Sequence, residues 1–88
     1  MPVSTTTRIE LTSAKALGKA IRDARAKTGL QQAEAALLRG VGIRYLSDLE
    51  NGKETVRLEQ ALKVIAGLGL VLTIGPKQPF WSKDGRPA

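Results

Sequence analysis

Apolar residues recur at helical spacing in four stretches of this chain, and glycines or polar residues separate these stretches. The first stretch follows a capping residue, Ser13 or Thr12, and stops at Gly29. A glycine suits the left-handed backbone conformation that often follows a helix. Its apolar positions are Leu17, Ile21 and Ala24. The pattern predicts a helix that begins near Ala14.

Two shorter stretches with the same period follow, over Gln32–Arg39 and about Ile43–Asn51. Gly40-Val41-Gly42 joins them, and Asn51-Gly52 ends the second. The positions expected to face inward are Ala33, Ala36 and Leu37 in the first and Leu46 and Leu49 in the second. The spacing is that of a helix-turn-helix with glycine in its turn.

The clearest helical period lies in a fourth segment, which we expect to be capped by Thr55 and to end at Gly67 and Gly69. Its apolar positions are Leu58, Ala61, Leu62, Ile65 and Ala66. The expected core is therefore built from short helices rich in Ala and Leu.

The segment after the fourth helix is β-branched and alternating and is followed by Gly75-Pro76, which predicts a short strand. The residues of this predicted strand are Leu70, Val71, Leu72, Thr73 and Ile74. One such strand is not stable alone. It would pair with the alternating segment Arg8-Ile9-Glu10-Leu11 or with the same strand of a second subunit. Pairing between subunits would close a twofold dimer.

The amino-acid composition excludes several kinds of metal site and catalytic group. The 88 residues allow one domain, and they include no Cys and no His, which removes disulfides, thiolate zinc sites and imidazole bases. The acidic residues are scattered singly, no apolar run is long enough for a membrane span, and nothing argues for secretion. We expect a soluble, cytoplasmic, non-enzymatic bacterial protein with no metal, cofactor, membrane or small-molecule ligand.

Positive charge is concentrated near the N-terminal end. The net charge is +6 and the isoelectric point about 10.2, a balance that favours nucleic acid or an acidic partner. Residues 13–30 hold one acidic side chain, Asp23, against the basic residues Lys15, Lys19, Arg22, Arg25 and Lys27. A solvated basic surface would have the same composition, so charge alone does not decide.

The residues around the turn resemble a known family. The quoted runs are Leu30-Gln31-Gln32-Ala33-Glu34-Ala35-Ala36, Gly40-Val41, and Leu46-Ser47-Asp48-Leu49-Glu50-Asn51-Gly52-Lys53. They are similar to the phage-repressor or Xre helix-turn-helix domains over about residues 13–69. The resemblance implies an all-α, lambda-repressor-like bundle of four to five helices, here followed by the short strand. The implied function is sequence-specific binding of double-stranded operator DNA by Val41–Gly52.

The resemblance also implies roles for individual residues. Gln32, at the start of a helix, would contact a base edge or the DNA backbone. Arg25 and Glu50 would form a structural ion pair between the first helix and the recognition helix. The positions that would read bases are Gln32, Gly42, Ile43, Arg44, Ser47 and Asp48.

Each base-reading residue also has a simpler interpretation. Arg44 can bond guanine O6 and N7, or contact a phosphate, or lie free on the surface. Ile43 suits a thymine methyl or packing against the turn, and Ser47 a base, a phosphate or solvent. Asp48 would accept from cytosine N4 or only disfavour wrong sites.

Phosphate contacts are expected after the recognition helix and on basic surfaces. The residues are Gln32, Tyr45, Lys53, Arg57, Arg39, Arg22 and Lys27. The hydroxyl of Tyr45 would reach a phosphate, or the ring would simply pack. Arg39 replaces a usual core aliphatic, so its stem would cover the core. Gln31 and Gly42 replace usual capping residues and predict weaker caps.

The helix-turn-helix domain is followed directly by Gly67-Leu68-Gly69-Leu70-Val71-Leu72-Thr73-Ile74. A domain with this extension resembles the HipB-type antitoxins of type II toxin–antitoxin modules. The expected organisation is a flexible segment over residues 1–12, the DNA-binding domain over 13–69, a dimerisation strand over 70–75 and a tail over 76–88. Phe80 and Trp81 would contact a HipA-like kinase toxin or fold back on the domain. The expected function is an autoregulating repressor and antitoxin that acts as a homodimer on the nucleoid. The alternatives are a stand-alone Xre-type regulator and a protein-interaction module with incidental DNA binding.

Overall fold

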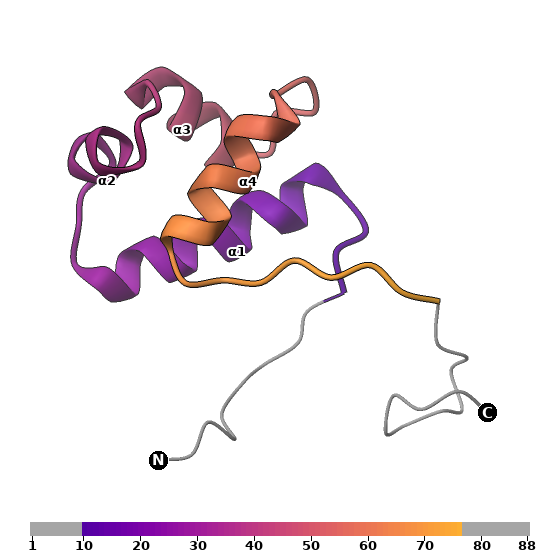
Figure 1. The fold of residues 1–88 in the computed structure, drawn as a ribbon. Coiled ribbons are helices and arrows are strands. Elements are labelled where there is room, and N and C mark those ends of the chain that lie inside the picture. The colour runs from indigo at the N-terminus through magenta and orange to yellow at the C-terminus, as the bar shows by residue number, and fades with distance from the viewer. Residues whose placement is uncertain (1–9, 77–88) are drawn as a thin grey trace, which may run out of the picture.

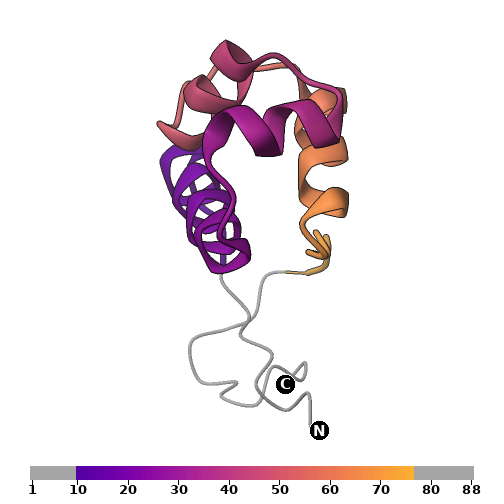
Figure 2. The same cartoon turned by 90° about the vertical axis from the view of Figure 1, so that its left-hand side faces the viewer.

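The computed structural model describes residues 10–76, which form four helices and the segments that connect them. The helices are α1 (Ala14–Thr28), α2 (Gln32–Arg39), α3 (Ile43–Glu50) and α4 (Leu58–Gly67). α1 packs against α3, α3 against α2, and α2 against α4. Figure 2 shows α1 and α4 on opposite sides of the molecule, with α2 and α3 across the top. The expected all-α helix-turn-helix bundle is confirmed.

The ends of α1 follow from local chemistry. Ser13 is extended, and its hydroxyl accepts a hydrogen bond of 3.0 Å from the backbone N–H of Ala16, which confirms it as the cap. The helix ends at Gly29, as expected. A capping hydrogen bond of this kind stabilises a helix by about 1 kcal/mol.

The start of α2 is held differently from the usual pattern. Gln31 precedes the helix, and its backbone N–H donates a 2.9 Å hydrogen bond to the carboxylate of Glu34. This hydrogen bond joins the residue before the helix to the side chain of the third helical residue. It compensates in part for the absence of a Ser or Thr side chain that would cap the helix.

The core lies where the four helices meet. Its buried members are Ile21, Ala35, Ala36, Val41, Leu46, Leu49, Ala61, Val64 and Ile65. The predicted inward positions Leu46 and Leu49 are confirmed. In α2 the prediction was confirmed for Ala36, which is buried, and was wrong for Ala33 and Leu37, which are exposed. Ala35, which was not predicted, is buried as well.

The apolar positions predicted for α4 were confirmed at Ala61 and Ile65, which are buried, and were wrong at the other three. Leu58 and Leu62 are 65% and 43% exposed, and Ala66 is exposed as well, whereas Val64 is buried. The helix begins at Leu58 after Arg57, so Thr55 is not its cap. The carbonyl of Arg57 accepts hydrogen bonds from the hydroxyl of Tyr45 and from the backbone N–H of Ala61, as the residue just before a helix does. Periodicity alone could not show which of two apolar flanks of α4 faces the core.

The strand predicted after α4 is not observed. Residues 70–76 follow α4 as an irregular segment, and no strand occurs within residues 10–76 (Figure 1). The prediction was therefore wrong for each of its five residues, all of which are exposed and none of which is in a strand: Leu70, Val71, Leu72, Thr73 and Ile74. A strand requires a partner, and the described part of the single chain supplies none, so the β-branched side chains of Val71, Thr73 and Ile74 do not suffice.

Two predicted contacts of this region fall on residues that the structure does not describe. Arg8 and Ile9, from the alternative partner segment of the strand, lie outside the described residues. Phe80 and Trp81 of the tail also lie outside them.

Candidate nucleic-acid interface

The turn between α2 and α3 positions one helix across the other. Gly40 ends α2 with φ of 73°, a left-handed conformation that a side chain would strain. The backbone N–H of Val41 then donates a 3.0 Å hydrogen bond to the carbonyl of Ala36, and the Val41 side chain is buried. Because the turn is closed by the backbone and anchored in the core, α3 begins in a fixed direction.

The outer side of α3 carries the residues expected to read bases. Gly42, Ile43 and Arg44 are exposed at its first turn, and the Ile43 side chain is 52% exposed. Ser47 and Asp48 lie one turn later and are half-buried. Leu46, Leu49 and Glu50 occupy the opposite, buried side. Ile43, Arg44, Ser47 and Asp48 therefore share one accessible side, and Gly42 is exposed just before the helix. The exposure of Ile43 argues against packing within this chain.

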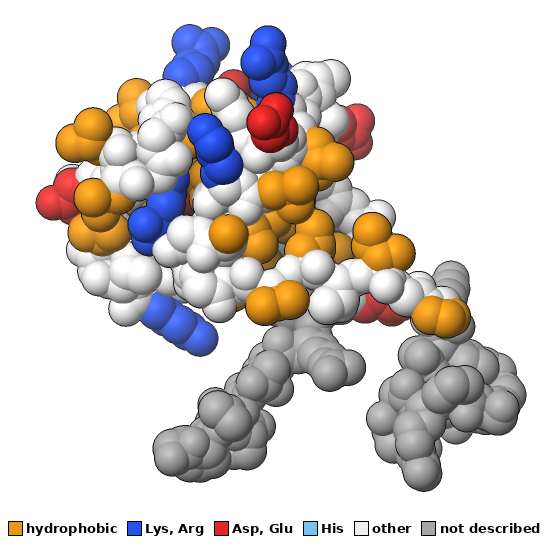
Figure 3. Space-filling model, in the orientation of Figure 1, with side chains coloured by type: hydrophobic (Ala, Val, Ile, Leu, Met, Phe, Trp, Pro, Cys, Tyr) orange, Lys and Arg blue, Asp and Glu red, His pale blue; other side chains and the backbone are white. Residues whose placement is uncertain are grey.

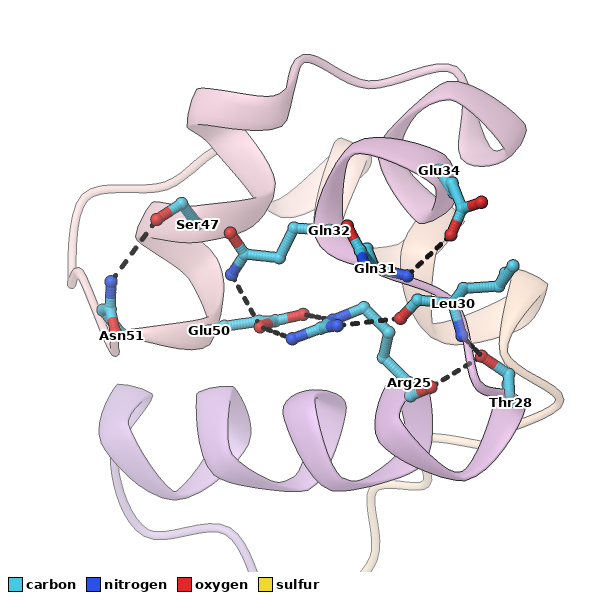
Figure 4. A network of polar contacts seen from close by, with 9 residues as sticks. All are labelled: Arg25, Thr28, Leu30, Gln31, Gln32, Glu34, Ser47, Glu50 and Asn51. Atoms are coloured by element: carbon cyan, nitrogen blue, oxygen red, sulfur yellow. Dashed lines mark hydrogen bonds and ion pairs between the residues drawn. The ribbon is translucent and has the colours of Figure 1, made fainter.

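A polar junction fixes α3 to α1 and α2 (Figure 4). The guanidinium of Arg25 donates to both carboxylate oxygens of Glu50, from Nε at 2.5 Å and from Nη2 at 2.8 Å. Its Nη1 donates to the carbonyl of Leu30 at 2.9 Å, and the amide of Gln32 donates to Glu50 at 2.9 Å. The Glu50 side chain is 1% exposed and the Arg25 side chain 15%. This is the ion pair that the family resemblance implied.

The junction keeps the Glu50 carboxylate charged. Burial raises the pKa of Glu50, but the hydrogen bonds from Arg25 and Gln32 and the charge of Arg25 outweigh it, so the pKa lies below its ordinary value. The hydrogen bond to Glu50 correspondingly raises the pKa of Arg25. Both partners thus remain ionised at neutral pH.

Gln32 has a structural role in addition to the role expected at the DNA. Its side-chain amide is committed to Glu50, and its backbone lies at the first turn of α2. A helix start presents N–H groups that favour an anion. Of the two roles predicted for Gln32, the arrangement therefore favours phosphate contact over base reading.

Two contacts connect the outer side of α3 to the loop after it. The ammonium of Lys53 lies 3.5 Å from the carboxylate of Asp48, and the amide of Asn51 donates to the Ser47 hydroxyl at 3.5 Å. Lys53 remains 55% exposed. The pairing offsets the charge by which Asp48 would repel a phosphate.

Tyr45 does not occupy the position expected of a phosphate contact. Its hydroxyl donates a 2.6 Å hydrogen bond to the carbonyl of Arg57, and the ring packs against the core. Burial raises the pKa of Tyr45, so the phenol stays a neutral donor. The packing alternative is the one that this geometry favours, while the Arg57 residue itself is exposed.

The remaining basic residues lie on different sides of the molecule. Arg39 lies against Gly67 of α4, where its side chain fills the space that a Cβ would need. This placement agrees with a stem that covers the core, and it directs Arg39 toward α4 and away from the start of α3. Arg22 and Lys27 are exposed on α1, and Arg22 lines a groove beside the end of α3.

Sequence reasoning missed the structural role of Gly18, and it predicted the turn at Gly52 but not the close contact that Gly52 makes with α1. A Cβ on Gly18 would lie 2.7 Å from the carbonyl oxygen of Glu50 and would also overlap that of Leu49, so α1 crosses α3 at this point. Gly52 has φ of 84°, and a Cβ there would lie 2.8 Å from the Cα of Lys15. A glycine inside a helix, which costs about 1 kcal/mol relative to alanine, was the signal available for Gly18.

The comparisons with known proteins agree with this geometry. The helix-turn-helix family profile matches residues 21–72. An uncharacterized HTH-type transcriptional regulator of Sinorhizobium fredii, y4mF, is 38% identical over 58 residues, which cover 66% of this chain and 76% of the relative. The chain therefore belongs to the helix-turn-helix family of DNA-binding transcriptional regulators.

Solved structures add the similarity of fold. A complex of a HipB variant with an O2 20-mer has a TM-score of 0.74 at 25% identity, covering 82% of this chain and all of that one. HipB in a HipA–HipB–O2–O3 complex has a TM-score of 0.73 at 24% identity, covering 81% of this chain and all of that one. The likeness to HipB structures agrees with the second resemblance found in the sequence.

Within residues 10–76, none of the helices is both long enough and apolar enough to cross a membrane. The same residues contain no group of three or more His, Cys, Asp or Glu side chains that could hold a metal ion.

Proposed function

We propose that this protein is a sequence-specific transcriptional repressor that inserts α3 into the major groove of its operator. The observation that carries the proposal is the division of α3 into a buried side and an accessible side that presents Ile43 and Arg44 at its first turn. Helix-turn-helix proteins read bases from this part of the second helix. The ion pair between Arg25 and Glu50 supports the proposal because it holds α3 rigidly.

In this proposal the reading residues have distinct roles. Arg44 bonds a guanine through O6 and N7, Ile43 contacts a thymine methyl, and Ser47 and Asp48 meet the following base pairs, with Gly42 allowing close approach. Gln32, Lys53, Arg57, Arg22 and Lys27 contact phosphates and set the register. The hydrogen bond of Tyr45 and the placement of Arg39 give these two residues structural roles instead.

We further propose that the repressor acts as a homodimer. Apolar side chains are exposed over α4 and the segment after it, as Figure 3 shows on one face. They include Leu58, Leu62, Val71, Leu72 and Ile74, of which Ile74 is 98% exposed. A second copy that covers this surface would remove an exposed apolar patch and bring two recognition helices to half-sites about 34–36 Å apart.

We also propose an antitoxin role for this protein. It is supported by the fold shared with HipB in a HipA–HipB complex and by the HipB-like order of bundle and extension. The partner would be a HipA-like kinase toxin, and Phe80 and Trp81 would contact it. Repression of the shared operon would place the protein on the nucleoid in the cytoplasm.

Binding to duplex DNA tests the repressor role. The chain is incubated with a library of random duplexes, the bound fraction is sequenced, and Arg44→Ala is compared with the control Lys63→Ala on α4. We expect Arg44→Ala to lose about 1–3 kcal/mol of discrimination at one base pair while the control selects the same site. Uniform weakening on all sequences would assign Arg44 to a phosphate, and no binding by the unaltered chain at low salt would refute the function.

The antitoxin role has a separate test. A kinase-like reading frame beside the gene is co-expressed with the full chain and with Phe80→Ser/Trp81→Ser. We expect co-purification and relief of growth arrest with the first and loss of both with the second. Sequence-specific DNA binding without such a neighbouring frame would favour the stand-alone regulator.

A further inference from the structure

The end of α3 carries Asn51 followed by Gly52, and Asn51 is the only asparagine in the 88 residues. The residue is exposed, and Figure 4 shows its side chain beside Ser47, one turn earlier on the helix. Its amide donates to the Ser47 hydroxyl at 3.5 Å, which is the long limit of a hydrogen bond. The side chain of Asn51 is therefore accessible and weakly held.

An asparagine that precedes a glycine has an intrinsic reaction, because glycine has no side chain to hinder attack by its backbone nitrogen. The Gly52 nitrogen gives its proton to water or hydroxide and forms a bond to Cγ of Asn51. The bond from Cγ to Nδ2 then breaks, and ammonia leaves with a proton taken from water. Water adds to either carbonyl of the resulting five-membered imide, and the ring opens to aspartate or isoaspartate.

The folded geometry restrains this reaction. Ring closure requires the Gly52 nitrogen to lie on the same side as Cβ of Asn51, but ψ of Asn51 is 1°, so the nitrogen eclipses the backbone nitrogen instead. The N–H of Gly52 also donates to the carbonyl of Leu49 at 3.1 Å, and the next N–H, of Lys53, donates to Asp48 at 3.0 Å. Attack therefore requires this turn to open and ψ to rotate.

Opening of the turn does not require the core to unfold. Residues 53–55 are exposed, and short segments of this kind open at a lower free energy than the whole domain. Two contacts oppose the opening. The backbone of Gly52 lies against that of Lys15, and the buried carboxylate of Glu50 is fixed by Arg25.

Either product changes the end of α3. An aspartate places a negative charge at the C-terminus of the helix, where the helix dipole disfavours it. Residue 51 also lines a groove with basic side chains of α1, which the new charge would partly neutralise: Lys15, Lys19 and Arg22. An isoaspartate adds one carbon to the main chain before Gly52, which displaces Gly52 from its close contact with α1.

We propose that Asn51-Gly52 is a site of spontaneous modification, at which local opening of the end of α3 converts Asn51 to aspartate or isoaspartate. The ion pair of Arg25 with Glu50 slows the conversion because it keeps the end of α3 closed. The conversion lowers the affinity of α3 for DNA. This last consequence rests on the proposed DNA-binding function, whereas the chemical conversion does not.

Peptide mapping of the full chain tests the conversion. The chain is held at mildly alkaline pH, where the Gly52 nitrogen loses its proton more readily, and a sample taken at the start corrects for conversion during digestion. Trypsin cleaves after Arg44 and Lys53, so residues 45–53 form one peptide that contains Asn51. Its mass reports the exchange of the amide for a carboxylate, and its retention separates aspartate from isoaspartate. Asn51→Gln is the matched control, because it keeps an amide but requires a less favourable six-membered ring.

We expect the unaltered chain to convert at residue 51, and to convert about 10-fold faster or more in guanidinium chloride, where the turn is always open. Asn51→Gln should not convert detectably. A chain that converts in guanidinium chloride and never in buffer would overturn the proposal. A mass change that persists in Asn51→Gln would also overturn it.

The role of the ion pair has its own comparison. Arg25→Met should convert about 3–10-fold faster than Arg22→Met, which removes the same charge from α1 and leaves Glu50 paired. Equal rates would overturn this role. Hydrogen exchange in the unaltered chain measures the opening without any substitution, and the amide of Gly52 should exchange faster than that of Leu46. Exchange of Gly52 only at the rate of global unfolding would overturn local opening.

The consequence for DNA is measured on fresh and converted chain separated by ion exchange, with a labelled duplex of mixed sequence. Asn51→Asp reproduces the aspartate product and should bind about 3–10-fold more weakly than the fresh chain, with the isoaspartate form weaker still. Converted chain that binds as tightly as fresh chain would overturn the consequence for DNA. Fresh chain that binds no DNA would refute the repressor role, while peptide mapping would still decide the modification site.

Discussion

Two regions of the molecule reverse the usual placement of polar residues outside and apolar residues inside. One is the contact between α1 and α3, and the other is the exposed flank of α4 that carries Leu58 and Leu62. At the α1–α3 contact, a carboxylate is 1% exposed and paired with an arginine, and a helical glycine touches the backbone of the facing helix. On α4, Leu58 and Leu62 are 65% and 43% exposed. Charge and glycine lie inside in one region, and leucine lies outside in the other.

The difference reflects what each region must do. The α1–α3 contact must hold α3 at one angle, and directional hydrogen bonds together with a close backbone approach achieve this better than flexible apolar packing. The α4 flank, by contrast, has apolar area that this chain leaves uncovered. An exposed patch of this kind marks a surface for another molecule, which we propose is a second copy.

The largest effect is expected from breaking the ion pair on one side. Arg25→Met leaves the buried carboxylate of Glu50 without its partner and should lower the free energy of unfolding by about 3–5 kcal/mol in urea titrations. The exposed Arg22→Met, three residues earlier on α1, should change it by less than about 0.5 kcal/mol. Arg25→Met/Glu50→Met should be more stable than Arg25→Met alone, because no charge stays buried. Equal losses in Arg25→Met and Arg22→Met would contradict the structural role.

The next effect comes from the helix crossing. Gly18→Ala forces a Cβ into the carbonyl oxygens of Leu49 and Glu50 and should cost about 3 kcal/mol of unfolding free energy, with weaker DNA binding because α3 tilts. Gly75→Ala, where nothing lies within 4 Å, is the control and should be close to neutral. A Gly18→Ala variant as stable as the control would show that the two helices can separate without loss.

The loss of stability at low pH also tests the buried ion pair at the contact between α1 and α3. The pKa of Glu50 is lowered in the folded protein, so its stabilising contribution is complete above the unfolded value of about 4.3 and is lost as pH falls through the folded pKa. Thermal melting between about pH 7 and pH 3 should therefore show a steeper loss in the unaltered chain than in Glu50→Gln. Parallel curves would mean that the exposed carboxylates, not Glu50, govern acid unfolding.

The smallest effect on folding is expected on the flank of α4. Leu62→Ser should change the unfolding free energy of the dilute protein by less than about 1 kcal/mol, because the side chain is already 43% exposed. At high protein concentration the loss should grow, and sedimentation should show dissociation of the dimer. A loss that does not depend on concentration would place Leu62 in the core of the single chain.

Much of the fold could be predicted because local signals agree with it. Ser13, Gly29 and Gly40 mark helix ends through their own backbone and hydrogen-bonding chemistry, and the observed helices α1, α2 and α3 agree with these signals. The accessible side of α3 follows from the burial of Leu46 and Leu49, which periodicity predicted. The pair of Arg25 and Glu50 came from family resemblance, since no local rule connects residues so far apart in sequence.

Other features depend on neighbours that the sequence does not specify directly. Tyr45 binds the carbonyl of Arg57 only because the loop before α4 returns past α3. Arg39 covers Gly67 only because α2 crosses the end of α4. The predicted strand at Leu70–Ile74 lacks a partner within the described chain, so its apolar alternation does not produce a strand there.

By itself the sequence determined where α1 and α2 begin and end, the helix-turn-helix spacing, and the residues that α3 presents. The tertiary structure decided which apolar flank of α4 is buried and that the Gln32 side chain is hydrogen-bonded to Glu50. It also decided that Lys15, Lys19 and Arg22 line a groove beside the end of α3. Caps and turns are set by residues close in sequence, whereas the choice between two apolar faces and the closing of an ion pair require the packed helices.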